Sequence, residues 1–212
     1  MSIADLRREY SQAGLREEDV DANPVVQFRK WFEEARAQEI IEPNAMILAT
    51  VDASGQPSTR VVLLKGVEER GFSFFTNYAS RKGHELAANP RASLTFPWLA
   101  LERQVCITGS VSQLSRSEAE AYFKTRPRGS RLGAWASTQS QVIPGRAFLE
   151  TGLAELEARY PGDDIPLPPT WGGYVLTPQE IEFWQGRPNR LHDRLRYQRQ
   201  ANGTWKIERL AP

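Results

Sequence analysis

Short apolar runs separated by tight turns dominate the chain from residue 45 onward, and they constrain the fold more than any other feature. Residues 45–51 (AMILATV) are typical of a buried strand, and the turn-forming residues 52–57 (DASGQP) lead directly into a second apolar run at 59–65. A second turn at 69–71 precedes a third run at 72–76. Connections this short join antiparallel neighbours, because a parallel pair needs a crossover of a dozen or more residues. The sequence therefore predicts an antiparallel meander.

The rest of the chain continues this pattern, with helices beside the strands rather than between them. Asn23 followed by Pro24 is typical of a helix N-terminus, and apolar residues from Val25 to Ala35 recur at helical spacing. Further strands are expected at residues 92–98, 102–114, 173–176, 180–185, 194–200 and 204–210, and further helices at residues 3–10, 80–88, 115–125 and 146–160. The predicted fold is mainly β with flanking helices (α+β), an antiparallel barrel rather than a parallel βαβ sheet.

Composition and missing motifs exclude several classes of protein. The 27 basic and 26 acidic residues nearly cancel, so the overall charge favours neither nucleic acid nor an anionic membrane as a partner. The one cysteine, Cys106, rules out an internal disulfide and is interpreted as a buried structural thiol, and two distant histidines predict no metal site. No apolar run reaches the roughly 20 residues of a membrane span and no secretory signal begins the chain, so a cytoplasmic protein is expected.

Two basic clusters lie in the first half of the chain. The run RVVLLK is flanked by Arg60 and Lys65, which strict alternation would place on opposite faces of a strand. Both can serve one site only if the strand bulges or twists, or if a ligand extends around the end of the strand. The alternative is that the two charged residues only keep the strand ends solvated. The second cluster, TNYASRK at residues 76–82, suits a phosphate cradle or an ordinary capped helix about equally.

Two more clusters follow in the second half. Tyr122 and Arg126 are four residues apart on a predicted helix, so both can reach one anion together with Ser130, although a solvated helix end would look similar. The segment FWQG at 183–186 and the motif RLHDR at 190–194 crowd a tryptophan, two arginines and one of the two histidines into a short span. So many cations close together need an anionic partner, which favours a functional role. Because the chain lacks a glycine-rich phosphate loop, side chains must bind that anion.

Taken together and in this order, these segments resemble the pyridoxamine 5′-phosphate oxidase family. The matching stretches are LRREY, RVVLLK, FFTNYASRKGHEL, NPRASLTFPW, LERQV, YFKTRPRGSRLGAWAS, the QS pair at 139–140, PLPPTWGGY, IEFWQG…RLHDR and the C-terminal YQRQANGTWKIERLAP. They cover nearly the whole chain, and IEFWQG…RLHDR is highly specific. One departure is Phe75, where tyrosine is usual in the family, and Pro188 and Asn189 vary the loop that enters the last motif.

The resemblance implies a fold and an assembly. The fold would be an FMN-binding split antiparallel β-barrel with surrounding helices. The molecule would be a homodimer with two FMN sites at the interface, each built from both chains. Residues 1–20 would form a flexible segment that can cover the site, and residues 21–212 a single FMN-binding domain.

The resemblance also implies roles for individual residues. FMN would be held by Arg60, Val61, Val62, Leu63, Leu64, Lys65, Phe75, Thr76, Arg81, Lys82, Gln104, Gln139, Ser140, Trp184 and Arg194. The substrate would be held by Lys65, Tyr122, Arg126 and Ser130 at its phosphate, and otherwise by Arg7, Arg8, Glu9, Tyr10, Arg190, Leu191 and His192. Arg190 and His192 would lie beside the pyridine ring and form the catalytic pair, with His192 as a hydrogen-bonding group rather than an obligatory base.

The implied reaction is oxidation of pyridoxamine 5′-phosphate or pyridoxine 5′-phosphate by O₂ to pyridoxal 5′-phosphate, with hydrogen peroxide and, from the amine, ammonia. In such enzymes the cofactor carries the redox chemistry while the protein supplies orientation and electrostatics. Two alternatives stay open. Another flavin or deazaflavin reductase on the same barrel would share the phosphate-binding cations, but it would have no reason to keep Tyr122, Arg126, Ser130 and RLHDR together. A non-catalytic protein that binds FMN or pyridoxal phosphate would produce no peroxide.

Overall fold

The computed structural model describes residues 2–3, 9–11 and 14–212. Within them one nine-stranded antiparallel sheet forms, with the order β2-β1-β5-β6-β7-β4-β3 and with β8 and β9 added beside β7. The meander prediction is correct for β1 and β2, which pair, but wrong for β4, which pairs with β3 and β7 and not with β2. The strands are β1 (Ala45–Val51), β2 (Pro57–Leu63), β3 (Gly66–Glu68), β4 (Gly71–Asn77), β5 (Arg91–Trp98), β6 (Arg103–Gln113), β7 (Trp171–Gln185), β8 (Asp193–Arg199) and β9 (Trp205–Arg209). The helices are α1 (Pro24–Ala37), α2 (Arg81–Ala88), α3 (Arg116–Thr125), α4 (Arg128–Ala136) and α5 (Arg146–Arg159).

Strand β7 divides the sheet and explains its split character. Its first half, from Trp171, pairs with β4, and its second half, to Gln185, pairs with β8, while β6 runs along both halves. The register between β6 and β7 shifts at Thr108/Gly109, opposite Pro178. A proline cannot donate to the ladder, so a bulge is where a central strand tolerates one. The two strands expected at 173–176 and 180–185 are therefore one continuous, bulged strand.

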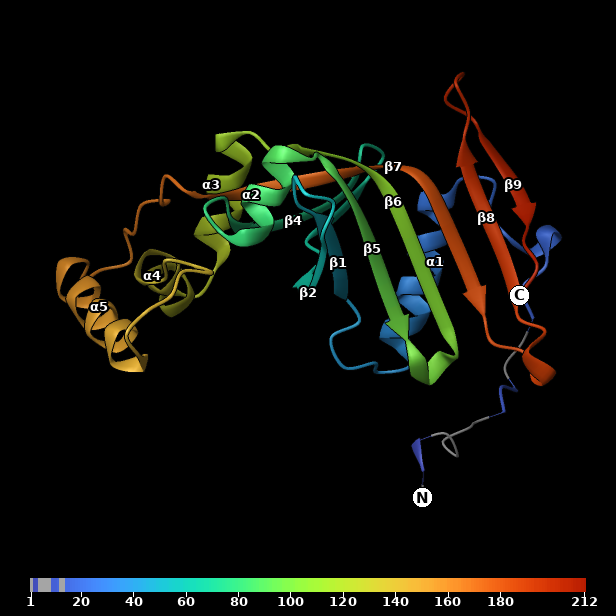
Figure 1. The fold of residues 1–212 in the computed structure, drawn as a ribbon, viewed down its shortest axis with the longest axis horizontal. Coiled ribbons are helices and arrows are strands. Elements are labelled where there is room, and N and C mark those ends of the chain that lie inside the picture. Colours follow the sequence, from blue (N-terminus) through green and yellow to red (C-terminus); the bar gives the residue numbers. More distant parts are fainter. Residues whose placement is uncertain (1, 4–8, 12–13) are drawn as a thin grey trace.

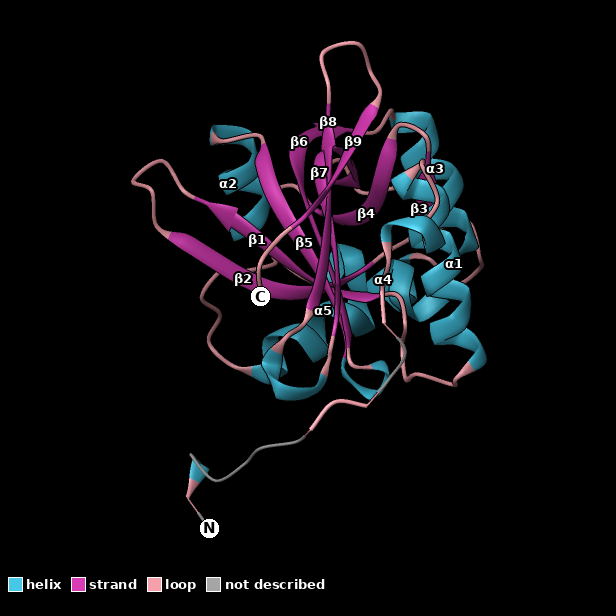
Figure 2. Cartoon of the chain, turned by 90° about the vertical axis from the view of Figure 1, so that its right-hand side faces the viewer, coloured by secondary structure: helices cyan, strands magenta, loops and turns pink. Residues whose placement is uncertain are grey.

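The elements are arranged so that two ends of the molecule differ. Figure 1 shows α3, α4 and α5 at one end of the sheet and β8 and β9 at the other. Seen from the side, α2 and α1 lie on opposite sides of the strands (Figure 2).

The main core forms between α1 and the sheet. Asn23 caps α1 by accepting a hydrogen bond from the Val25 N–H at 2.9 Å, as the Asn-Pro pair predicts. The fully buried Phe28 ring lies with its centroid 4.9 Å from those of Phe72 and Phe96. Burying an aromatic side chain of this kind stabilises the fold by roughly 1.5–3 kcal/mol.

A smaller apolar cluster holds the helical end together. Its buried members are Ala119, Phe123, Leu132, Ile165, Leu167 and Trp171. It joins α3 and α4 to the irregular, proline-rich segment 161–169. Helix α3, predicted at 115–125, begins with a capping box of Ser115 and Glu118.

Some local predictions were wrong or lie outside the described residues. The short strand β3 and the helix α4 were missed, and the strand predicted at 59–65 is displaced toward the N-terminus, to Pro57–Leu63. The helix expected at 3–10 falls mostly on residues that the structure does not describe, while residues 9–11 have no regular structure. Cys106 is half-buried rather than buried, and its burial raises the pKa of its thiol, which agrees with an inert side chain.

Candidate functional site

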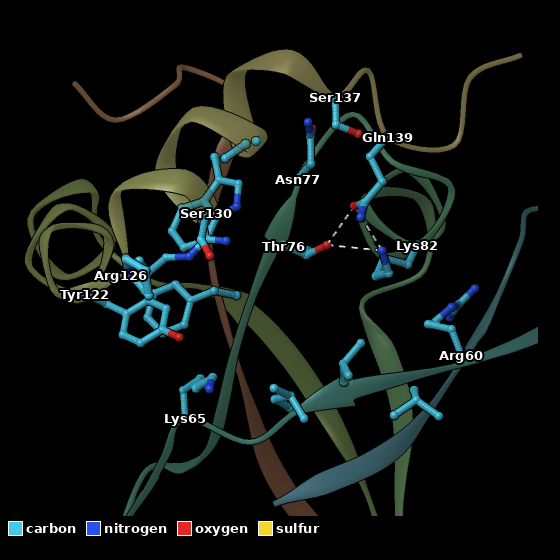
Figure 3. A pocket seen from close by; sticks show the side chains of 18 of the residues that line it. Arg60, Lys65, Thr76, Asn77, Lys82, Tyr122, Arg126, Ser130, Ser137 and Gln139 are labelled. Atoms are coloured by element: carbon cyan, nitrogen blue, oxygen red, sulfur yellow. Dashed lines mark hydrogen bonds between the residues drawn. The ribbon is translucent and has the colours of Figure 1, made fainter. Parts of the chain in front are cut away.

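A cavity of about 870 Å³ opens between the end of β2, the strand β4 and the helices α3 and α4. It is within the size range of small-molecule sites. Figure 3 shows its cations in two groups, with Arg60 and Lys82 on one side and Lys65 and Arg126 on the other. Side chains from predicted site residues line it: Arg60, Val61, Val62, Leu63, Lys65, Phe75, Thr76, Lys82, Tyr122, Arg126, Ser130 and Gln139.

Lys82 is the buried cation of the first group. Ser80 caps α2 and places Lys82 in its first turn, where the side chain is 8% exposed. Its Nζ donates to Thr76 Oγ1 at 3.1 Å and to Gln139 Oε1 at 3.2 Å. Burial, and then the neighbouring Arg60 charge, lower the pKa of the Lys82 ammonium. An anion in the cavity would offset both the burial of the ammonium and its repulsion by Arg60.

Arg60 belongs to a buried network around one carboxylate. Its Nη2 donates to Ser58 Oγ at 2.5 Å and to Glu85 Oε2 at 3.1 Å. Arg81 donates through Nε to the other Glu85 oxygen at 2.8 Å. Burial alone would raise the pKa of Glu85, but hydrogen bonds from Thr50, Ser58, Arg81 and Arg60 outweigh it and lower that pKa to about 2. Glu85 is therefore ionised and holds both arginines in fixed orientations.

The second group lies where β2 has ended. Lys65 follows the strand, and its backbone N–H donates to the carbonyl of Ser73 at 2.8 Å. Strict alternation therefore stops before Lys65, and both ends of RVVLLK reach the same cavity. Tyr122, near the end of α3, lies beneath Lys65, whose Nζ is 5.9 Å from the centroid of the ring. Ser130 reaches the same side of the cavity from α4.

Arg126 is the C-cap of α3 and lies against rings instead of carboxylates. Its Cζ is 4.8 Å from the ring centroid of Trp171 and 5.7 Å from that of Phe123. The Nη1 atom is buried and has no hydrogen-bond partner among the described residues. Burial lowers the pKa of the guanidinium, although an arginine stays charged at any ordinary pH. A buried donor without a partner is costly, so this atom suits an anionic ligand.

The remaining predicted site residues do not line this cavity. Leu64 is buried in the main core, and Arg81 and Ser140 line a smaller neighbouring cavity of about 470 Å³. Arg7 and Arg8 lie outside the described residues. Glu9 is described but is not among the residues that line the cavity. The cavity also uses residues that the sequence did not single out, notably Ser137 and Trp171.

Gln104, Trp184 and Arg194 form a second set at the other end of the sheet. Register pairs Gln104 with Trp184 and Trp184 with Arg194, so the three lie in one row across β6, β7 and β8. Arg194 is held by a bidentate pair to Glu182 at 2.8 and 3.0 Å. This row lies near the end of β7 that is far from α4 (Figure 1).

Tyr10 and His192 pack on this row. The Trp184 ring centroid is 4.6 Å from that of His192 and 5.8 Å from that of Tyr10, so Tyr10 packs beside the RLHDR motif. The backbone N–H of Arg187 donates to His192 Nδ1 at 3.1 Å, which leaves Nε2 to carry the proton of the neutral ring. Leu191 beside it is 69% exposed.

Asn189 and Arg190 have an unusual backbone in the same loop. Both lie in the left-handed region, with φ of 56° and 61°. Non-glycine residues rarely adopt it, and such positions concentrate at functional sites. The single chain thus presents two separate sets of predicted site residues, one in the cavity and one around His192.

Within the described part of the chain, no cluster of side chains could hold a metal ion. The helices described there are also too short or too polar to cross a membrane.

Fold and cavity together define an antiparallel split-barrel protein whose site is lined by cations and suits anionic ligands. Residues 32–160 match the description "Pyridoxamine 5′-phosphate oxidase", and residues 171–212 match the "Pyridoxine 5′-phosphate oxidase C-terminal dimerisation region". The chain belongs to the pyridoxine/pyridoxamine 5′-phosphate oxidase family, and the match to the dimerisation region supports a homodimer.

Individual relatives agree with this membership. The chain is 61% identical over 211 residues to the pyridoxine/pyridoxamine 5′-phosphate oxidase of Ralstonia pickettii, covering 100% of this chain and 99% of the relative. It is 58% identical to the protein of the same name from Nostoc punctiforme, with 100% and 99% covered. Among solved structures, PhzG from Burkholderia lata, in complex with tetrahydrophenazine-1-carboxylic acid, has a TM-score of 0.89 at 35% identity, covering 95% of this chain and 100% of that one.

Proposed function

We propose that the protein catalyses the FMN-dependent oxidation of pyridoxamine 5′-phosphate and pyridoxine 5′-phosphate to pyridoxal 5′-phosphate. With the amine, substrate, O₂ and water yield the aldehyde, ammonia and hydrogen peroxide; with the alcohol, substrate and O₂ yield the aldehyde and hydrogen peroxide. One observation carries the proposal: a single cavity holds two separate groups of cations, so it can accept two phosphorylated molecules side by side.

The first group fits the FMN phosphate. Arg60, Lys82 and Thr76 offer charged and hydroxyl donors of the kind that bind a phosphate dianion. Among the described residues, the partners of the buried Lys82 ammonium are Thr76, Ser80 and Gln139, and none is a carboxylate. Apolar residues Val61 to Leu63 border the same side of the cavity and could pack along the cofactor. When bound, FMN would supply the two-electron acceptor chemistry.

The second group fits the substrate phosphate. Lys65 comes from the turn between β2 and β3, Tyr122 and Arg126 from the end of α3, and Ser130 from α4, and the four meet on one side of the cavity. Two cations and two hydroxyls suit a phosphate dianion, and Arg126 Nη1 is a donor in need of an acceptor. Anchoring the phosphate would orient the reacting carbon of the substrate.

Arg190 and His192 would complete the site from the partner chain. Their loop lies at the far end of the sheet from α4, so a second copy is the simplest source of these groups for any one cavity. His192, with Nδ1 occupied by the Arg187 N–H, would donate through Nε2 to a substituent of the pyridine ring. That role is hydrogen bonding, as the resemblance implies, and not proton abstraction.

The test is to identify the flavin of the purified protein by mass spectrometry and to measure peroxide after adding pyridoxamine 5′-phosphate. We expect FMN, and peroxide and pyridoxal 5′-phosphate in equal amounts. Bound FAD, or no flavin after reconstitution, would contradict the cofactor assignment. Tight binding of FMN without peroxide would instead favour a binding protein.

The likeness to PhzG makes a second activity worth measuring in the same assay. That structure holds a reduced tricyclic carboxylic acid, which also carries an anionic group. The four residues proposed to bind the substrate phosphate favour the phosphorylated pyridine as the substrate. Faster turnover of a tetrahydrophenazine carboxylate than of pyridoxamine 5′-phosphate would reverse this assignment.

A further inference from the structure

The cations around the cavity differ in how their charge is balanced. Arg60 and Arg81 are both ion-paired with the buried Glu85, at 3.1 and 2.8 Å. No ion pair between Arg126 and an acidic side chain occurs among the described residues, although the guanidinium is half-buried. Something other than a carboxylate must therefore stabilise Arg126 in its position.

Trp171 lies where such a group is needed. It is the first residue of β7, its side chain is 7% exposed, and its indole faces the Arg126 guanidinium, with Cζ 4.8 Å from the ring centroid. The electron-rich face of an indole attracts a cation, and more strongly when water is excluded. Unlike a carboxylate, it leaves the full positive charge available to a ligand.

The same indole also fixes Tyr122. Trp171, Phe75 and Tyr122 form a parallel stack, in which the Phe75 ring centroid is 5.5 Å from Trp171 and 4.0 Å from Tyr122. The planes of Trp171 and Tyr122 differ by only 10°. Arg126 and Tyr122 therefore both lie against one tryptophan, whose backbone is fixed by pairing with Asn77 of β4 and by donation of its N–H to the Pro168 carbonyl at 3.2 Å.

We infer that Trp171 is a positioning residue for the substrate phosphate, holding Arg126 and Tyr122 toward the cavity without neutralising the arginine. The inference rests on the proposed function and deepens it, because it names what makes the substrate side selective for a phosphorylated ligand. It assigns Trp171 no contact with the reacting atoms.

The test is a double-mutant cycle between Trp171 and Arg126 in the FMN-loaded enzyme. Trp171→Leu should raise the KM for pyridoxamine 5′-phosphate about fivefold to thirtyfold, the range for losing a desolvated cation–π contact. The value of kcat should change less than about twofold, and flavin content should stay constant, because the phosphate is remote from the reacting carbon. The inhibition constant of inorganic phosphate should rise in parallel with KM.

The second arm of the cycle separates positioning from general destabilisation. In an Arg126→Ala background, Trp171→Leu should raise KM by less than about twofold, since its partner is gone. Trp31→Phe is the matched control, because Trp31 is also buried and has the Arg103 guanidinium 4.3 Å from its ring centroid, but in the main core. It should leave KM and phosphate inhibition unchanged.

The outcomes are distinct. An equal rise of KM in both backgrounds would overturn the inference, as would an unchanged KM in Trp171→Leu. If that variant does not fold, Trp171→Phe replaces it: a phenyl face should retain most of the affinity, with a rise of about twofold to threefold that disappears without Arg126. The absence of that rise, or its persistence without Arg126, would overturn the inference as well. A wild-type enzyme that does not oxidise pyridoxamine 5′-phosphate would overturn the proposed function itself, and this inference with it.

Discussion

Arg60 is hydrogen-bonded to Ser58 and Glu85, whereas one terminal nitrogen of Arg126 has no partner among the described residues. In the first arrangement the guanidinium is held in place by a carboxylate that partly balances its positive charge. The second leaves the charge free for a ligand and uses aromatic rings for support. This contrast suggests that the two sides of the cavity recognise their phosphates differently, and it can be tested residue by residue.

Arg126→Ala and Arg190→Ala should affect different kinetic constants. Loss of a charge-assisted contact to a phosphate costs roughly 1.5–3 kcal/mol, so Arg126→Ala should raise KM about tenfold to hundredfold and leave kcat nearly unchanged. Arg190→Ala should lower kcat, because the pyridine ring loses its alignment with the flavin. Both variants should keep FMN, unlike Arg60→Ala. Steady-state kinetics with pyridoxamine 5′-phosphate decide this, and wild-type constants in both variants would disprove the assigned substrate site.

Glu85 predicts a pH dependence of stability. Its pKa is lowered from 4.5 to about 2 in the folded protein. A carboxyl group whose pKa is depressed by folding stabilises the fold above its unfolded pKa, and this stabilisation is lost as pH falls toward the folded value. The free energy of unfolding should thus decrease between about pH 5 and about pH 2, and less steeply in Glu85→Gln. Denaturant titrations at several pH values across that range measure the free energy of unfolding. The same dependence of that free energy on pH in the wild type and in Glu85→Gln would contradict the prediction.

Single residues also show what the sequence could and could not reveal about the site. Arg60, Lys82 and Arg126 were recognised because cations in apolar contexts require an explanation. Trp171 was missed because a tryptophan that begins a strand looks like ordinary core, and its role depends on Arg126, which is distant in sequence. Lys65 posed a conflict with strand alternation that only the end of β2 at Leu63 resolves.

At the scale of elements, the sequence predicted best what depends on local interactions. The capped helix α1, the helix α3 and the hairpin of β1 and β2 follow from neighbouring residues, and the structure confirms them. The continuation of that meander from β2 to β4 was wrong, because β4 pairs with β3 and with the distant β7. Helix α4 was missed because it has no side-chain cap, and its place is fixed by packing against α5 and the segment 161–169. The continuity of β7 across Pro178 depends on its partner β6, so periodicity along one strand could not show it.

Gly83 gives a prediction for the element that carries Lys82. A Cβ at this position in α2 would lie 2.1 Å from the carbonyl oxygen of Tyr78, so the helix would have to shift. Gly83→Ala should lower the free energy of unfolding by about 1–3 kcal/mol, as overpacking does, and weaken FMN binding, because Arg81 and Lys82 move with α2. Fluorescence titration with FMN and thermal unfolding measure both effects.

Gly152→Ala is the matched control. Gly152 lies inside α5, where an added Cβ would meet nothing within 4 Å. Because alanine favours the helix, this variant should be more stable by about 0.5–1 kcal/mol, with unchanged FMN affinity. An unshifted stability and affinity in Gly83→Ala would show that α2 tolerates displacement and that its packing does not position the cofactor phosphate.

At the scale of the whole molecule, the separation of the two residue sets is the main structural fact. The cavity lies near α3 and α4, whereas Trp184, Arg190 and His192 lie at the opposite end of the sheet (Figure 1). Helix α5 has no fully buried residue within the single chain, although Leu153 and Leu156 are partly buried, and Val142 and Leu191 are highly exposed. These surfaces are compatible with the homodimer that the C-terminal dimerisation match supports.

A shared site predicts that two defective variants restore each other's activity. If one chain supplies Arg126 and its partner supplies Arg190, each mixed dimer of Arg126→Ala and Arg190→Ala has one intact site and one doubly defective site. Random reassociation of equal amounts makes about half of the dimers mixed, so about a quarter of all sites should be intact. We expect activity at low substrate to rise toward about a quarter of the wild-type value after the variants are unfolded and refolded together with FMN. If a single chain supplied both arginines, every mixed dimer would hold two singly defective sites. Refolding together would then give only the average of the two separate activities, and the assignment of Arg190 to the partner chain would be wrong.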